Sequence, residues 1–229
     1  MAKKERKKRN FNPPKWCICT EGVTEALYLK AYCVELDIKH LVDINSERSG
    51  CIRKKGEACG RQHRPLIDQA QICNKKSGYE RMFIVHDLDD DGNPETIKSF
   101  DESFEMGEAV GISVYYSIPS FEYWLLLCNN LVDSDLTRTV CSDKVKVHVN
   151  AKCKEKDAPP LRNDTYKTEP ALFDYFDGIS GAIRAKENAI KIWSSRSLSG
   201  PPKKPSTVKP STNFYLLLDE LKTFSDKQK

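Results

Sequence analysis

The strongest constraint on the fold is the alternation of short apolar runs with amphipathic segments through the first part of the chain. Runs with strand character cover residues 15–20, 41–44, 82–85 and 112–116, and segments with helical spacing cover 24–36, 65–75 and 95–106. Such alternation requires crossover connections between parallel strands, and the connecting helices then cover both faces of the sheet. The sequence therefore predicts an α/β fold with a mostly parallel sheet of about four strands. Pro119 is expected to open a further helix in its first turn.

The pattern changes after residue 132. Residues 133–165 are polar and show no clear element, whereas 169–193 has helical spacing with Gly178 and Gly181 as weak points. A loop rich in Ser, Pro and Lys follows at 194–210, and 212–224 has the spacing of a last amphipathic helix. These changes predict a flexible basic arm at 1–13, an α/β domain at 14–132 and a helical C-terminal extension at 133–229.

Charge and hydropathy narrow the class of protein. The net charge is +4, but residues 1–9 alone hold six lysine or arginine side chains and one glutamate. Such an arm is typical of a phosphate-seeking tail, because clustered cations release counterions from nucleic acid, and equally of a solubilising tail. No apolar run approaches the roughly 20 residues that a membrane helix needs, so we expect a cytoplasmic protein without a membrane span.

Nine cysteines are many for a cytoplasmic chain, and their odd number excludes a complete set of intrachain disulfides. Cys17, Cys19 and Cys128 lie in apolar runs and are expected to be buried thiols. One further grouping has metal-type spacing, but it lacks a C-x-x-C pair, so structural zinc is disfavoured. That grouping consists of Cys51, Cys59, His63 and Cys73.

An acidic segment follows directly on the predicted strand at 82–85. Asp87 and Asp89 form a D-x-D pair, and alternation along an extended backbone points both carboxylates to roughly the same side. Carboxylate oxygens are the ligands that Mg²⁺ takes from proteins, together with water and substrate phosphate. A solvated acidic turn would have the same composition. The pair is therefore either a metal site or a turn.

Two more acidic groups lie at the ends of strands, where ligands gather in open parallel sheets. Glu21 follows the first strand and has no evident local structural role, which favours a functional one. Thr24 is expected to cap the next helix, and Glu25 is favourable in its first turn. Glu122 is expected in the first turn of a later helix, where the helix dipole alone would account for it.

Two other metal-dependent classes of protein also carry an acidic D-x-D pair. An EF-hand loop is excluded, because Lys98 stands where a bidentate Glu is required and Pro94 interrupts the loop. A haloacid-dehalogenase-like phosphatase also carries D-x-D after a strand, with the first Asp as nucleophile. Asp91 replaces the Thr or Val expected in such an enzyme, so this alternative ranks third.

Read in order, the motifs resemble the Toprim domain. They are E-G-x-T-E at 21–25, D-x-D at 87–89 and P-S-F-E-Y-W-L-L-L at 119–127. More narrowly, the chain resembles the RloB family of bacterial restriction and phage-defence loci. That resemblance extends through Tyr166-Lys167, the helix at 182–186 and Pro210-Ser-Thr212, and covers about residues 14–224. The chain departs from the family pattern in the extra acids Asp90 and Asp91, and in Cys128-Asn129, where a His often stands.

The resemblance implies a set of roles for these residues. Glu21 would act as general acid or base, Asp87 and Asp89 would bind Mg²⁺ or Mn²⁺, and Glu122 would complete the metal shell. Lys167 or Arg184 would stabilise the negative charge that develops at phosphorus.

The function so implied is a Mg²⁺-dependent nuclease acting in anti-phage defence, with DNA or RNA, including tRNA, as substrate and an ATPase as partner. A Toprim-derived nucleic-acid-binding or regulatory subunit with little catalysis is the second candidate. The sequence leaves the oligomeric state open.

Overall fold

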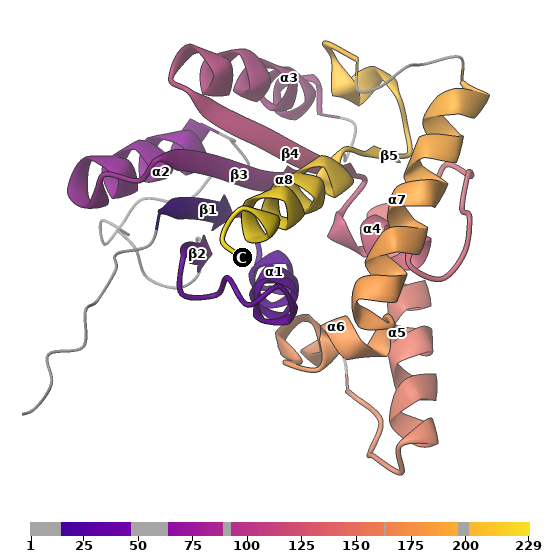
Figure 1. Ribbon diagram of the computed structural model, residues 1–229. Coiled ribbons are helices and arrows are strands. Elements are labelled where there is room, and N and C mark those ends of the chain that lie inside the picture. Colours follow the sequence, from indigo (N-terminus) through magenta and orange to yellow (C-terminus); the bar gives the residue numbers. More distant parts are fainter. Residues whose placement is uncertain (1–14, 47–63, 89–92, 163, 197–201) are drawn as a thin grey trace, which may run out of the picture.

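A five-stranded sheet forms the centre of the molecule (Figure 1). The computed structural model describes residues 15–46, 64–88, 93–162, 164–196 and 202–229. Strand order is β2-β1-β3-β4-β5, and the first four strands in this order run parallel to one another. Their bounds are Trp16–Thr20 for β1, Val42–Ser46 for β2, Arg81–Asp87 for β3 and Ile112–Ile118 for β4. The predicted α/β class with a mostly parallel sheet is confirmed.

The fifth strand was not predicted from the sequence. Strand β5, Ser211–Thr212, pairs antiparallel with the end of β4 and comes from the C-terminal extension. Two residues are too few for a period-two pattern, so the sequence alone does not reveal such a strand. It forms because Ser211 and Thr212 follow the Pro-rich segment that returns the chain to the edge of the sheet.

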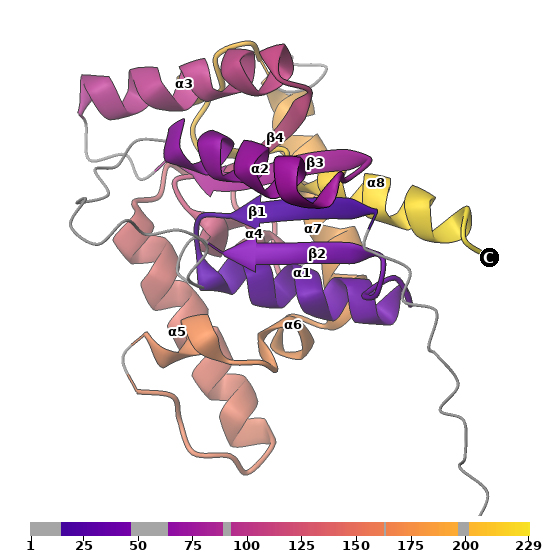
Figure 2. The same ribbon diagram turned by 90° about the vertical axis from the view of Figure 1, so that its left-hand side faces the viewer.

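Helices cover both faces of the sheet (Figure 2). Helices α2 and α3 lie on one face, and α1 and α8 pack on the other. Alternate residues of the strands serve the two faces: Ile18 and Phe83 pack with α1 and α8, whereas Cys17 and Met82 pack with α2. The four helices are α1 Val23–Glu35, α2 Arg64–Ser77, α3 Pro94–Ala109 and α8 Phe214–Asp226.

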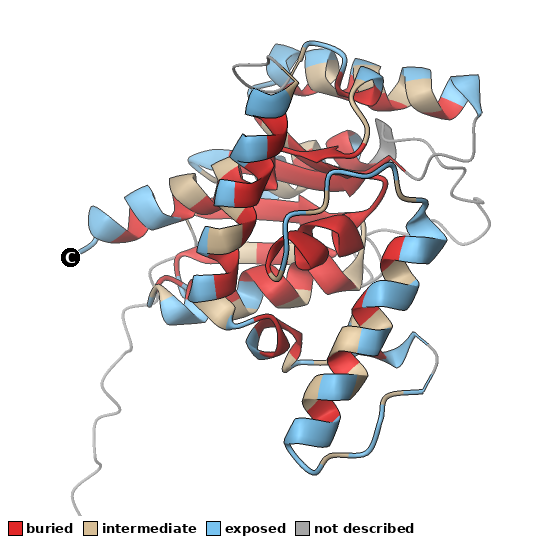
Figure 3. Cartoon of the chain, turned by 90° about the vertical axis from the view of Figure 1, so that its right-hand side faces the viewer, coloured by how far each residue is buried: buried red, intermediate tan, exposed pale blue. Residues whose placement is uncertain are grey.

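The remaining helices lie beside the sheet and share its larger core cluster (Figures 1 and 3). Phe214 at the start of α8 makes edge contacts with Tyr28, Phe121 and Trp124, so the C-terminal extension is packed into the core rather than appended to it. The elements are α4 Phe121–Leu127, α5 Arg138–Glu155, α6 Leu172–Tyr175, α7 Gly178–Ser195, and the 3-10 turns η2 Thr165–Thr168 and η3 Pro205–Thr207.

Helix α5 occupies the segment to which the sequence assigned no element. It buries a single row of residues spaced by four, and the other positions are polar or exposed. This narrow row is hard to distinguish in a polar segment, whereas a core-facing helix normally carries a wider apolar stripe. The buried residues are Cys141, Val145, Val149 and Cys153.

Two details of the predicted helices differ in the structure. Pro119 does not open α4: the Ile118–Pro119 peptide is cis, and the helix begins at Phe121 after Ser120. The long helix expected at 169–193 is broken at Asp177 and Gly178, both of which have positive φ, so α6 and α7 are separate. Glycine adopts that backbone conformation without steric cost, and Asp is one of the few other residues that tolerate it.

Gly181 lies so close to the preceding backbone that an added Cβ atom would be 1.8 Å from the carbonyl oxygen of Phe176. We expect Gly181→Ala to lower the free energy of unfolding by about 1–3 kcal/mol, since backbone must move to admit the methyl group. Urea unfolding would measure this loss. Ser180→Ala, at an exposed neighbouring position of the same helix, serves as the control and should be neutral. Equal stability of the two variants would contradict the tight contact.

The expected buried thiols are present: Cys17, Cys19 and Cys128 are buried and unpaired by disulfide. Cys51, Cys59 and His63 of the disfavoured zinc grouping lie outside the described residues, as does the arm at 1–13. Of the helices that the structure describes, not one combines the length and apolar character needed to cross a lipid bilayer.

Candidate functional site

The site is set by the point where the sheet changes its winding direction. Strands β1 and β3 are neighbours, but the chain leaves β1 through α1 on one face and leaves β3 through α3 on the other (Figure 2). Their carboxyl ends therefore flank the position in which open α/β sheets bind ligands. Glu21 is the first residue after β1, and Asp87 is the last residue of β3.

Glu21 and Asp87 are brought together at this position. The Glu21 amide donates to the Val85 carbonyl at 3.0 Å, which extends the β1–β3 pairing by one step. The Asp87 amide in turn donates to the Glu21 carboxylate at an N–Oε2 distance of 3.3 Å. Asp87 is buried, with 8% of its surface exposed. Two of the three residues on which the sequence hypothesis depended thus converge, and Asp89 lies outside the described residues.

Glu25 lies close to Glu21, and Glu21, Asp87 and Glu25 are called the acidic cluster below. The sequence did not predict this position, because the helix dipole already explained Glu25. It is buried, and its carboxylate lies against Gly22, where a Cβ atom would be 2.2 Å from Glu25 Oε2. Gly22 also stands at the N-cap of α1 without a side-chain cap, so Thr24 does not cap the helix as predicted. The Thr24 hydroxyl instead donates to the Lys167 carbonyl at 3.3 Å.

The pKa of Glu25 reflects its burial and its charged neighbours. Burial, with smaller contributions from the carboxylates of Glu21 and Glu122, raises this pKa to about 8, although a backbone hydrogen bond and the Lys167 charge act to lower it. Glu25 Oε2 is buried and accepts no hydrogen bond from any described residue. A carboxyl group in this state is one that a bound cation would ionise.

Glu122 lies at the start of α4, as predicted, and is paired with Lys167 of η2. The Lys167 ammonium is 3.0 Å from Glu122 Oε1, and the Tyr166 hydroxyl donates to the same oxygen at 2.9 Å. Burial alone would raise the pKa of Glu122, but the Lys167 charge and hydrogen bonds lower it below its ordinary value. Burial, together with smaller effects of the Glu122 and Asp87 charges, raises the pKa of the Cys141 thiol in α5 to about 12.

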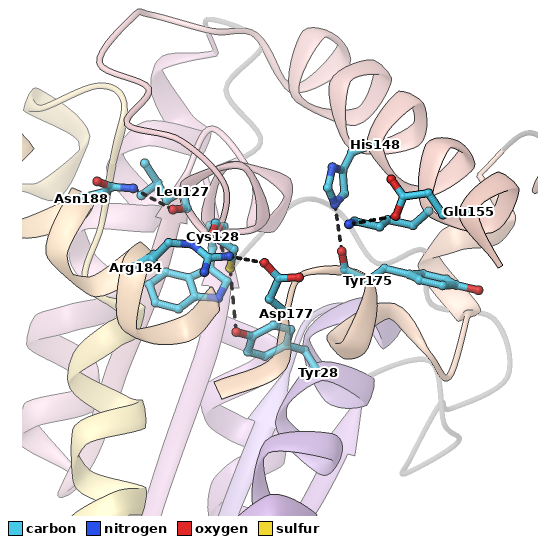
Figure 4. Close-up of polar contacts among 11 residues, drawn as sticks. Tyr28, Leu127, Cys128, His148, Glu155, Tyr175, Asp177, Arg184 and Asn188 are labelled. Carbon is cyan, nitrogen blue, oxygen red and sulfur yellow. Dashed lines mark hydrogen bonds and ion pairs between the residues drawn. The ribbon is translucent and has the colours of Figure 1, made fainter. Parts of the chain in front are cut away.

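Arg184, the other predicted cation, makes its contacts elsewhere (Figure 4). Its Nε donates to the Cys128 carbonyl at 2.8 Å, and its guanidinium pairs with Asp177. Cys128 directly follows α4, so Arg184 satisfies a carbonyl at the end of that helix and ties α7 to it. These contacts account for Arg184 structurally, and its catalytic role stays a prediction.

The donors of the cluster fit a hard divalent cation. Glu21, Glu25 and Asp87 supply carboxylate oxygens, which Mg²⁺ and Mn²⁺ prefer. Burial and, to a smaller extent, the neighbouring carboxylates raise the pKa of Glu25, and Glu25 Oε2 is buried without a hydrogen-bond partner among the described residues. Within the described ranges, which omit Asp89, side chains of His, Cys, Asp and Glu form no preassembled group of three or more metal ligands.

Comparison with known proteins addresses the family. The model of the family described as RloB-like protein matches residues 16–221, which is most of the chain. No curated protein and no solved structure matches the chain. The matched region runs from β1 to α8 and includes Glu21, Asp87, Glu122 and Lys167. The chain therefore belongs to the RloB-like protein family.

Proposed function

We propose that this protein is a Mg²⁺-dependent nuclease that cleaves phosphodiester bonds of a nucleic acid. The observation that carries the proposal is the convergence of Glu21 and Asp87 at the carboxyl ends of β1 and β3, with Glu25 beside them. Carboxylates that meet at a topological switch point, one of them with a pKa raised by burial and to a smaller extent by its acidic neighbours, are typical of a functional site. The cluster also places Lys167 beside these acids.

The residues that would hold the cation are Glu21, Asp87 and Glu25, together with Asp89 of the D-x-D pair. A bound Mg²⁺ supplies an activated water at neutral pH and neutralises charge on the phosphoryl oxygens. Glu21 is the candidate general acid or base, because its carboxylate lies at the carboxyl end of β1 and contacts the Asp87 amide at 3.3 Å. Lys167, whose side chain is 25% exposed, can approach a substrate phosphate.

We extend the proposal to the biological setting on the strength of family membership. As an RloB-like protein, the chain would serve as a cytoplasmic effector in anti-phage defence, gated by an ATPase partner. Either DNA or RNA, including tRNA, fits a site that contacts phosphates rather than bases. The described contacts involve no base-reading element, so the substrate panel below includes both nucleic acids.

The test is a cleavage assay with purified protein. Plasmid, single-stranded DNA and total tRNA are incubated with Mg²⁺, Mn²⁺ or EDTA. We expect cutting of at least one substrate that requires metal and is lost in Glu21→Gln. Binding without cutting under any metal would instead support a nucleic-acid-binding subunit. Hydrolysis of a small phosphomonoester that is abolished by Asp87→Asn would favour the phosphatase.

A further inference from the structure

A buried hydrogen-bond chain enters the acidic cluster from α5. Tyr166, which is fully buried, has its hydroxyl oxygen 2.6 Å from Ser142 Oγ and 2.9 Å from Glu122 Oε1. Because a tyrosine hydroxyl carries one proton and Glu122 is an acceptor, that proton goes to Glu122 and Ser142 donates to Tyr166. Burial and the nearby Glu122 charge raise the pKa of Tyr166, so its hydroxyl stays a donor.

The same oxygen of Glu122 also receives the Lys167 ammonium. Glu122 Oε1 thus accepts from two donors, which use both of its lone pairs. The side chain of Glu122 is only 5% exposed, whereas that of Lys167 is 25% exposed. The Lys167 ammonium therefore lies between a buried carboxylate and solvent. The backbone carbonyl of Lys167 accepts a hydrogen bond from the Thr24 hydroxyl of α1.

We propose that Glu122 is the counter-ion of Lys167 rather than a metal ligand. Tyr166 and Ser142 are then positioning residues that hold this ion pair. Held in this way, Lys167 can contact a phosphate group of the substrate. A divalent cation on Glu122 Oε1 would have to displace an ammonium and a hydroxyl that satisfy this oxygen already. The inference rests on the proposed function for the identity of the substrate, but its metal-binding part does not depend on cleavage.

The first experiment separates the two roles of Glu122 by measuring Mn²⁺ binding to the full-length protein calorimetrically. Glu122→Gln should bind Mn²⁺ within about twofold of the wild-type affinity, whereas Asp87→Asn should weaken binding at least about tenfold. A loss of tenfold or more in Glu122→Gln would overturn the counter-ion assignment. Asp219→Asn is the matched control, because Asp219 pairs with Lys186 away from the cluster.

The second experiment measures binding of a single-stranded oligonucleotide in EDTA at several salt concentrations. Lys167→Met should lower the slope of log affinity against log salt by about one, because one phosphate contact is lost. Glu122→Gln should tighten binding about threefold to tenfold, since a buried negative charge is removed behind the ammonium. Weaker binding in Glu122→Gln would contradict the assignment. Lys186→Met is the matched lysine control.

The third experiment tests the positioning residues by steady-state cleavage kinetics. Tyr166→Phe should lower kcat about tenfold and leave KM and the Mn²⁺ affinity unchanged, and Ser142→Ala should have a smaller effect in the same direction. Tyr32→Phe is the control, because it also removes a buried hydroxyl, which in this case donates to the Leu218 carbonyl. This variant should retain the wild-type kcat. An unchanged kcat in Tyr166→Phe would overturn its positioning role. If the wild-type protein cuts no nucleic acid, the proposed function fails, and the two binding experiments still decide the assignment of Glu122 and Lys167.

Discussion

Asp87→Asn is expected to lower kcat/KM for metal-dependent cleavage by about 10³-fold or more, because a neutral amide replaces a carboxylate assigned to the cation. The same substitution should not lower the stability of the metal-free protein. Asp87 is buried at the end of β3 and its amide contacts the Glu21 carboxylate, so removing the Asp87 charge relieves like-charge repulsion with Glu21. The free energy of unfolding in EDTA should therefore stay the same or rise.

Loss of activity without loss of stability distinguishes a functional acid from a structural one. Asp43→Asn is the matched control, because Asp43 lies on β2 of the same sheet and accepts a 2.6 Å hydrogen bond from the Tyr79 hydroxyl. That variant should keep its activity and lose about 1 kcal/mol of stability. The site assignment would be wrong if Asp87→Asn cut nucleic acid at the wild-type rate.

Glu25→Gln is expected to stabilise the metal-free protein, by an amount that grows with pH. The pKa of Glu25 is about 8 in the folded protein and 4.5 in its ordinary state, so the folded protein binds more protons between these values. Stability of the wild-type protein therefore falls as pH rises from about 4.5 to 8, by at most about 5 kcal/mol. The Gln side chain of the variant does not ionise, so its burial costs no such pH-dependent loss of stability. We expect Glu25→Gln to exceed the wild-type by about 2–4 kcal/mol at pH 8 and by little at pH 5.

Urea unfolding in EDTA at these two pH values measures the difference. Glu35→Gln, an exposed position on the same helix, is the control and should show no such dependence on pH. Saturating Mg²⁺ should raise the stability of the wild-type protein more than that of Glu25→Gln, because binding to the folded state ionises the carboxyl group. A wild-type protein as stable at pH 8 as at pH 5 in EDTA would show that folding does not raise the pKa of Glu25.

Cases where the sequence prediction and the structure differ have a common physical origin. Helix α5 and strand β5 were missed because a row of four buried residues and a two-residue pairing give weak periodicity. Glu25 was assigned to the helix dipole because its local position explains it fully. Its functional surroundings arise from Glu21 and Glu122, and the latter lies 97 positions away along the chain (122 minus 25). Local propensity does not report such contacts.

The sequence by itself determined the α/β class, the carboxyl-end placement of Glu21 and Asp87, and the resemblance to the RloB-like family, because these depend on strand–helix alternation and on motifs within short segments. Only the tertiary structure decided that Glu25 interacts with Glu21 and Glu122. It also decided that the Glu122 carboxylate is paired with Lys167 and accepts a hydrogen bond from Tyr166, and that Arg184 donates to a carbonyl at the end of α4. Those pairings connect α1, α4, η2 and α7, and the packing that brings these elements together is stabilised by a shared core rather than by any local pattern.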